Sequence, residues 1–351
     1  MKKLKSTLLI LMSLLLLLGA AGCGDTQNQP DGGEESPYIE EVDPVTDSDD
    51  KQPEASPVNI RIASLKGPTT MGMVKLMSDC EAGATQGSYT VDIYGTADEI
   101  VPLVVSGEID VANIPCNLAS ILYNRTEGGI SVVNINTLGV LYIVETGESI
   151  QSVEDLRGKT IYSTGKGTTP EYVLNHILTQ SGIDPLNDVT VEFKSEATEV
   201  AAMLEGSEDA VAVLPQPYVT VAMTKNDSIR IALDLTEEWE KVVGSSMVTG
   251  VTIVRNEFLE ANPEAIDLFL EEYAASVEYV NTDVEGAAAL VGAYDIVAEG
   301  VAKTALPYCN IVSVTGEDMK KSVSDYLSVL YESDPSSVGG NLPDDSFYSV
   351  G

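Results

Sequence analysis

The chain has 351 residues and a formal net charge of −36, from 55 acidic and 19 basic side chains. Such a charge repels nucleic acid and anionic lipid headgroups, so the composition excludes a nucleic-acid-binding protein. The four cysteines contain no C-x-x-C pair and the chain has one histidine, so we expect no metal site and no cofactor. One disulfide between two of Cys80, Cys116 and Cys309 is compatible with the sequence.

The first 23 residues have the order of a secretory signal. Three lysines precede an apolar run from Leu8 to Leu18, and "GAAGC" follows. The run is too short to span a membrane. Cys23 after Ala-Ala-Gly resembles the bacterial lipobox, with Ala20 where that motif usually has Leu. The resemblance implies that Cys23 carries diacylglycerol and palmitate and anchors the chain without crossing the membrane. The alternative is an ordinary signal peptide with a chance cysteine.

The next segment, residues 24–57, is acidic and poor in apolar residues. It holds eleven acidic residues, one lysine and five prolines. Such a segment buries too little apolar surface to offset its ordering entropy, so we expect a disordered tether. Residues 58–351 keep a net charge of −29 and are long enough for two lobes.

Strand-like stretches alternate with helix-like stretches through the first part of the folded region. The predicted strands are residues 58–65, 89–95, 109–115, 130–136 and 139–146. Strands separated by helices of this length indicate βαβ units and a mostly parallel sheet. The fold class is therefore α/β.

The pattern then restarts with a short helix at 152–158, where Ser152 and Asp155 are spaced as a capping box. Predicted strands follow at 159–164, 188–194 and 209–215, separated by predicted helices at 169–182 and 197–206. The third strand of each series lies in a similar stretch, "GEIDVANIP" at 107–115 and "GSEDAVAVLP" at 206–215. The repeat predicts two similar lobes facing each other across a ligand cleft. Generic βα sequence preferences are the alternative explanation.

The last hundred residues are mostly helical. A strand at 248–255 precedes a long helix that starts at Asn262 and Pro263 and runs to about Tyr279. Two further helical stretches are residues 284–299 and 316–332. We expect this part to return to the first lobe.

Several stretches together resemble the solute-binding proteins of ABC importers, and within them the nitrate, sulfonate and thiamine-precursor branch of the type II periplasmic-binding-protein family. They are the two repeats, "SVEDLRGKTI", "VTGVTIVRNEFLEANPEAIDLFLEEYAASVEYVN" and "LPDDSFY". The resemblance implies two α/β lobes joined by two crossing strands, near Tyr142–Thr146 and Met247–Val251. The first lobe is then 58–143 plus 250–351, and the second is 144–249.

Ligands of open α/β sheets lie at the carboxyl ends of strands, where loops lead into helix N-termini. Four such loops supply the candidate ligand-binding residues. These are Lys66, Gly67, Thr69, Thr70, Met71, Asn113, Cys116, Asn117, Gly167, Thr168, Thr169, Gln216 and Tyr218. Their side chains suit a small, uncharged or modestly anionic solute held by hydrogen bonds.

The resemblance implies an extracytoplasmic solute-binding lipoprotein, a monomer that delivers its solute to a membrane permease driven by an ATPase. It would sit lipid-anchored on the outer face of a bacterial cell membrane. No catalytic motif is present and the single histidine, His176, lies mid-helix, so we expect no enzyme. A ligand-binding sensor lipoprotein, or an extracytoplasmic enzyme on the same fold, is the alternative.

Overall fold

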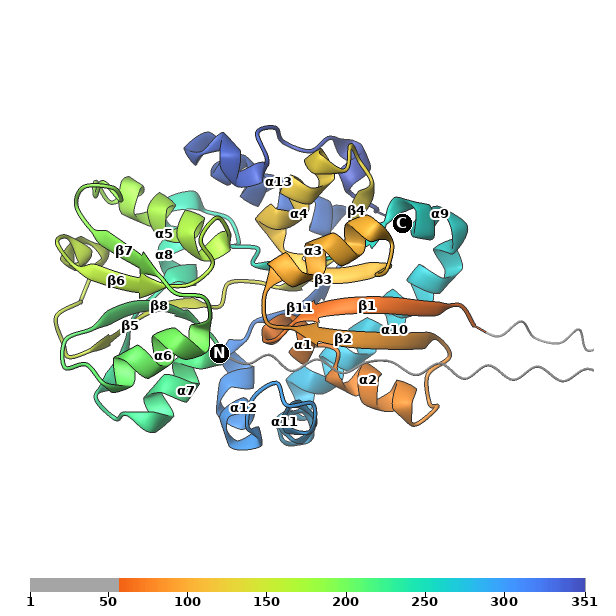
Figure 1. Ribbon diagram of the computed structural model, residues 1–351, viewed down its shortest axis with the longest axis horizontal. Coiled ribbons are helices and arrows are strands. Elements are labelled where there is room, and N and C mark those ends of the chain that lie inside the picture. Colours follow the sequence, from red (N-terminus) through yellow and green to blue (C-terminus); the bar gives the residue numbers. More distant parts are fainter. Residues whose placement is uncertain (1–56, 351) are drawn as a thin grey trace, which may run out of the picture. The chain divides into compact units, whose positions relative to one another are not determined.

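The computed structural model describes residues 57–350. The predicted signal peptide, Cys23 and the tether up to residue 56 lie outside these residues. Within them the chain forms two β-sheets, each flanked by helices (Figure 1). No helix in residues 57–350 is both long enough and apolar enough to cross a membrane.

The first sheet has six strands in the order β11-β4-β10-β3-β1-β2. Strands β1 to β4 share one direction, and β10 and β11 run against them. We call this sheet and its helices the first lobe. Its strands are β1 (Asn59–Leu65), β2 (Ser88–Tyr94), β3 (Val111–Pro115), β4 (Ile130–Thr137), β10 (Gly250–Arg255) and β11 (Ile311–Val314).

The second sheet has five strands in the order β7-β6-β8-β5-β9. Only β5 runs against the other four. This sheet and its helices are the second lobe. In each sheet most strands share one direction, as expected, but the pairing is mixed, because every pair that involves β10, β11 or β5 is antiparallel. Its strands are β5 (Leu141–Thr146), β6 (Thr160–Ser163), β7 (Thr190–Phe193), β8 (Val211–Pro215) and β9 (Ile229–Asp234).

The two lobes share one strand plan, which confirms the interpretation of the repeat. β3 and β8, the strands of the two similar sequences, each lie between a parallel partner (β1 or β6) and an antiparallel strand (β10 or β5). β2 and β7 extend the parallel side of each sheet in the same way.

Helices cover both sheets. The first lobe carries α1 (Pro68–Met71), α2 (Val74–Glu81), α3 (Ala97–Ser106), α4 (Cys116–Arg125), α9 (Asn256–Ala261), α10 (Pro263–Thr282), α11 (Val284–Ala293), α12 (Glu299–Ala305) and α13 (Gly316–Ser333). The second lobe carries α5 (Thr169–Gln180), α6 (Ala197–Glu205), α7 (Tyr218–Lys225) and α8 (Leu235–Val243). Single 3₁₀ turns are η1 (Val153–Leu156), η2 (Leu306–Tyr308), η3 (Pro335–Val338) and η4 (Asp345–Phe347).

Local signals explain several element boundaries, and one prediction was wrong. The capping box of Ser152 and Asp155 is present and starts η1. The predicted single helix at 284–299 is split, because α11 ends at Ala293 and Asp295 adopts a left-handed backbone with φ 52°. A residue in that conformation cannot continue a right-handed helix.

The chain passes from the first sheet to the second at residues 138–140 and returns at residues 244–249. The first crossing is a few residues earlier than predicted, because β5 pairs along its length with strands of the second sheet. One hydrophobic core cluster contains residues of both lobes, whereas two further clusters are each confined to one lobe.

The C-terminal residues after α13 form a strap along α4. Three polar side chains of α4, Asn117, Ser120 and Asn124, donate hydrogen bonds to the carbonyls of Ser337 and Val338 at 2.8–3.0 Å. Further along the strap, the fully buried Phe347 packs edge-on against Tyr123. The strap therefore belongs to the first lobe.

Candidate functional site

A cleft of about 760 Å³ lies between the two lobes. Its walls are the loops at the carboxyl ends of the parallel strands, with one additional segment around α12. Equivalent loops face each other: residues 65–66 and 164–166 follow β1 and β6, residues 95–98 and 194–198 follow β2 and β7, and Pro115 and Pro215 end β3 and β8. The duplicated strand plan thus places two half-sites opposite one another.

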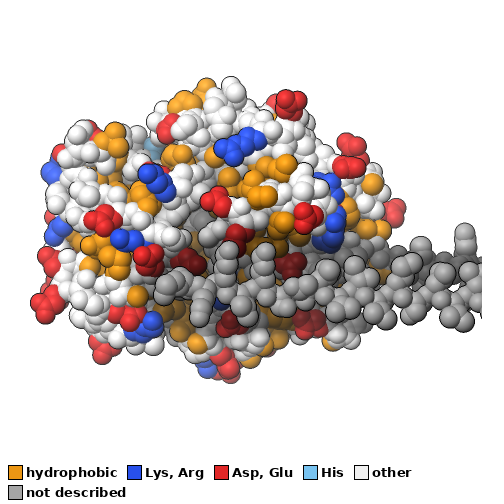
Figure 2. Space-filling model, viewed as in Figure 1, with side chains coloured by type: hydrophobic (Ala, Val, Ile, Leu, Met, Phe, Trp, Pro, Cys, Tyr) orange, Lys and Arg blue, Asp and Glu red, His pale blue; other side chains and the backbone are white. Residues whose placement is uncertain are grey.

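The cleft concentrates positive charge in a strongly acidic protein. Lys66, Lys166, Lys194 and Lys225 line it, against the carboxylates of Asp98 and Glu196. Elsewhere on the face shown in Figure 2, acidic side chains are spread over both lobes with fewer basic ones between them. Three of the four lysines come from the second lobe, so that wall is the more cationic.

The four lysines differ in how far their charges are already paired. Lys194 is the most enclosed, with 22% of its side chain exposed, and its Nζ lies 3.4 Å from Glu192. Lys225 pairs with Glu205 at 2.8 Å, and Lys66 lies 3.9 Å from the fully exposed Asp295. Lys166 forms no ion pair with any residue in 57–350 and lies over the Phe193 ring at 6.0 Å. Charge is therefore available in the cleft for an anionic ligand.

Part of the cleft lining is apolar. Ile296, Val297 and Val301, from the start of α12 and the turn before it, line the cleft together with Val221 of α7. The left-handed residue Asp295 turns the chain just before this wall. The cleft therefore combines cations with an apolar surface, as ligand sites for organic solutes commonly do.

The structure brings four of the sequence-predicted residues into the cleft lining: Lys66, Thr168, Thr169 and Tyr218. Burial raises the pKa of Tyr218, so its phenol stays protonated and can donate a hydrogen bond. The remaining candidates lie outside the lining. They are Gly67, Thr69, Thr70, Met71, Asn113, Cys116, Asn117, Gly167 and Gln216.

Several of these side chains bond to the first lobe itself. The Thr69 hydroxyl donates to the Leu65 carbonyl at 2.9 Å, and Thr70 donates to Ser64 at 2.9 Å. Asn113 is fully buried, donates to Ser64 at 3.1 Å and accepts from Thr252 at 2.8 Å. Met71 is also fully buried. These groups hold the loop after β1 in place rather than facing the cleft.

The other candidates lie behind the cleft floor. Asn117 donates to the Gly167 carbonyl at 3.3 Å, which links the two lobes. Gln216 accepts from the Thr220 hydroxyl at 2.9 Å and is almost fully buried. Cys116 is fully buried, and burial raises the pKa of its thiol, so it is neither a nucleophile nor a ready ligand contact. Cys80, Cys116 and Cys309 are all free thiols.

Sequence reasoning missed two half-site loops and the apolar wall. Residues 95–98 and 194–198 follow strands just as the chosen loops do, so the strand-end rule applied to every strand would have found them. Residues 296–301 reach the cleft only because α11 and α12 fold back to it. Nothing in the local sequence predicts that these residues line the cleft.

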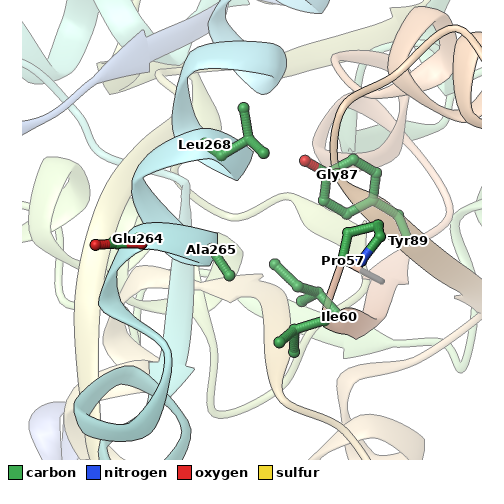
Figure 3. A pocket seen from close by; sticks show the side chains of 8 residues that line it. Pro57, Ile60, Gly87, Tyr89, Glu264, Ala265 and Leu268 are labelled. Carbon is green, nitrogen blue, oxygen red and sulfur yellow. The ribbon is translucent and has the colours of Figure 1, made fainter. Parts of the chain in front are cut away.

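A second, smaller pocket of about 180 Å³ lies away from the cleft, between α10 and the edge of the first sheet. Leu268 and Ala265 of α10 face Ile60 and Tyr89 across it (Figure 3). Its lining is mostly apolar, because the Tyr89 hydroxyl already donates to Glu272 and Glu264 points away from the pocket in Figure 3. We therefore assign the site to the cleft.

The single histidine lies away from the cleft. His176 lies on α5 with its ring against Trp239, and it is absent from the cleft lining. No group of three or more His, Cys, Asp or Glu side chains within residues 57–350 is arranged to hold a metal ion.

Comparison with known proteins agrees with this geometry. The sequence model of the family described as NMT1/THI5 like matches residues 91–287, which is more than half of the chain. No curated protein sequence matches the chain.

Three solved structures are similar along almost their whole length. An ABC transporter protein from Parabacteroides distasonis has a TM-score of 0.68 and 21% identity, covering 83% of this chain and 98% of its own. The periplasmic aliphatic sulphonate binding protein of Escherichia coli has a TM-score of 0.66 and 16% identity, covering 81% and 91%. The alkanesulfonate-binding protein of Xanthomonas axonopodis pv. citri, bound to MOPS, has a TM-score of 0.64 and 16% identity, covering 83% and 96%. These likenesses confirm the expected periplasmic-binding-protein fold.

Proposed function

The chain belongs to the NMT1/THI5-like family, and on this premise we propose that it is the extracytoplasmic solute-binding subunit of an ABC importer. The observation that carries the proposal is the cleft, whose walls are equivalent strand-end loops of two lobes. A solute that touches both walls favours the closed state and can be handed as a complex to a permease. Sulfonate-binding proteins of importers share the fold.

The solute class follows from the lining. Four lysines against two carboxylates favour a solute with negative charge, and the wall of Ile296, Val297 and Val301 favours an apolar body. A cleft of about 760 Å³ suits an organic molecule and is far larger than a nitrate or sulfate ion needs. We therefore propose an organic anion, such as a sulfonate or an aromatic carboxylate, with its charged group on the second lobe.

The proposed location and lipid anchor of the protein rest on the N-terminal sequence. Cleavage before Cys23 and lipidation there would hold the protein on the outer face of a bacterial membrane. The acidic tether would then let a monomer reach a permease, whose ATPase partner drives import. Mass spectrometry of the native protein, which would find or fail to find lipid on Cys23, tests this part separately.

A binding protein fits the site better than an enzyme does. The only histidine and the buried Cys116 both lie outside the cleft lining. A sensor lipoprotein would use the same cleft, so it remains the alternative outcome. Uptake of labelled solute, lost on deletion of the gene and restored by the chain, distinguishes import from signalling, and recovery of unchanged solute from the protein distinguishes binding from turnover.

The first experiment is a thermal-shift panel on the mature chain, residues 23–351 with Cys23→Ser. Solutes would include nitrate, sulfate, alkyl and aromatic sulfonates, aromatic carboxylates, pyrimidines and flavins. A native-selective ligand at a hundred times its Kd adds about 2.7 kcal/mol, which raises the melting temperature by several degrees. Stabilisation by organic anions that is lost in Lys166→Ala and kept in Lys321→Ala supports the proposal. Stabilisation by no compound, on protein free of co-purified ligand, refutes it.

A further inference from the structure

The only histidine and the only tryptophan of the chain lie against each other. His176 of α5 and Trp239 of α8 have ring centroids 5.1 Å apart at an interplanar angle of 48°. On its other side Trp239 contacts Tyr326 of α13, with centroids 5.3 Å apart. Trp239 and Tyr326 are completely buried, and His176 is 8% exposed.

This aromatic stack joins the two lobes. α5 and α8 belong to the second lobe, whereas α13 packs on β4 and α4 of the first lobe. All three rings lie at the one hydrophobic cluster of residues 57–350 that contains residues of both lobes. Aromatic side chains bury about 150–250 Å² each, so parting the lobes here would expose a large apolar area.

The two lobes also meet at the opposite edge of the cleft. There α12 of the first lobe contacts α7 of the second. In Figure 1, α13 lies at the top of the view and α12 at the bottom, with the two sheets on either side. A rotation of the lobes about the stack would part α12 from α7.

A hydrogen bond sets the tautomer of the neutral histidine. His176 Nδ1 lies 2.7 Å from Ser333 Oγ, at the end of α13. Because the Ser333 hydroxyl donates to the Val329 carbonyl at 3.0 Å, its oxygen accepts from Nδ1–H. Nε2 of the neutral ring is then the atom that would take up a proton.

The charges around the His176 ring oppose the effect of burial on its pKa only weakly. The charged side chains on α5 and α8 are Glu171, Glu237, Glu238, Glu240 and Lys241. Those on α13 and at its end are Glu317, Asp318, Lys320, Lys321, Asp325, Glu332 and Asp334. Burial lowers the pKa of His176, and the charge of Glu332 raises it by less, so the pKa lies below the usual value of 6.5. The ring is therefore neutral at pH 7 and gains its proton only in acid.

We propose that His176, Trp239 and Tyr326 form a pH-sensitive pivot between the lobes. With His176 neutral, the stack and the bond to Ser333 keep the lobes joined along α13. A proton taken from solvent onto Nε2 puts a charge into a site where burial disfavours the charged ring by more than Glu332 favours it, so protonation favours a state in which His176 leaves the stack and reaches solvent. Acid conditions then free the lobes and weaken the hold on a solute, although the titrating residue does not line the cleft.

The experiment uses the fluorescence of the single tryptophan in the empty mature chain. As the pH falls from 8 to 5, Trp239 fluorescence should drop in one step with a midpoint below 6.5. Acrylamide quenching should be weak at pH 8 and rise severalfold at pH 5. The variant His176→Gln, which keeps a donor for Ser333 and cannot take up a proton here, should show neither change.

A second pair of variants tests the bond to α13. Ser333→Ala removes the acceptor of His176 and should increase quenching at pH 8 about twofold or more. Ser328→Ala on the same helix loses only a bond to the Ser324 carbonyl and should match the parent protein. No pH step in the parent, the same step in His176→Gln, or free access of acrylamide at pH 8 would overturn the proposal. No solute is added, so the outcome is independent of the proposed function.

Discussion

Replacing Lys194 by alanine tests whether the cleft ligand carries negative charge. The side chain is 22% exposed, its Nζ lies 3.4 Å from Glu192, and it sits 5.5 Å from the centre of the Tyr162 ring. An anion at 4 Å would gain about 4 kcal/mol at an effective dielectric constant of about 20. Water and Glu192 screen part of this, and hydrogen bonds to charged groups contribute about 1.5–3 kcal/mol net. The Kd should therefore rise about 10- to 150-fold.

Isothermal titration calorimetry with the best solute from the thermal-shift panel measures this change. Lys321→Ala is the control, because that lysine is 76% exposed on α13 and pairs only with Asp325. The loss in Lys194→Ala should shrink between about 0.05 M and 0.5 M salt, as a contact between partly exposed charges requires. A Kd within twofold of the parent value, or a loss equal to that of Lys321→Ala, would refute the reasoning.

Three further predictions concern the fold. Phe347→Ala empties a fully buried site beside Tyr123. It should lower the free energy of unfolding, measured by urea denaturation, by about 3–5 kcal/mol. A loss below about 1 kcal/mol would contradict the packing of the strap. Burial alone would raise the pKa of Glu145, but hydrogen bonds from the following turn and the charge of Arg230 outweigh it and hold the pKa below the usual 4.5. Glu145 therefore stabilises the fold above that pH and the stability is lost as pH falls below it, so urea denaturation from pH 5 to 3 should be less pH-dependent in Glu145→Gln. Burial raises the pKa of the Cys116 thiol, so a thiol reagent at pH 8 should label it only after unfolding, and rapid labelling of the native protein would argue against its burial.

The parts of the fold that could be predicted from the sequence are those whose pattern is local. Alternation and turn residues predicted β1 to β8, and the repeat predicted that β3 and β8 hold equivalent places. The sequence pattern predicts no helix or strand in residues 219–247, although α7, β9 and α8 lie there. The strand β9 is an edge strand with two buried residues, so its hydrophobic signal is weak.

The sequence predicts which loops form the candidate site more accurately than it predicts which side chains line it. The strand-end rule predicts which loops reach the cleft, and Lys66, Thr168 and Thr169 lie there. It does not predict which way a polar side chain turns. Thr69 and Asn113 have the same chemistry as a binding residue, yet their hydrogen bonds go to Leu65 and Ser64 within the first lobe. Buried polar groups bond to the nearest partner, and that partner is known only from the packed structure.

The two half-sites have the same backbone plan but different electrostatics, and this difference determines how an anion would be held. At the start of α3 in the first lobe, Glu99 already accepts from the Thr96 N–H at 3.0 Å, and Asp98 adds a second negative charge. The equivalent loop of the second lobe also has two acids, Glu196 and Glu199, and Glu199 accepts from the Ser195 N–H at 3.3 Å, but this lobe adds Lys194 and Lys225 to the cleft. The first lobe adds the apolar side chains of Ile296, Val297 and Val301. The shared strand plan therefore explains where the cleft lies. The side chains that differ between the two half-sites, and the helices that only the first lobe has, determine what the cleft binds.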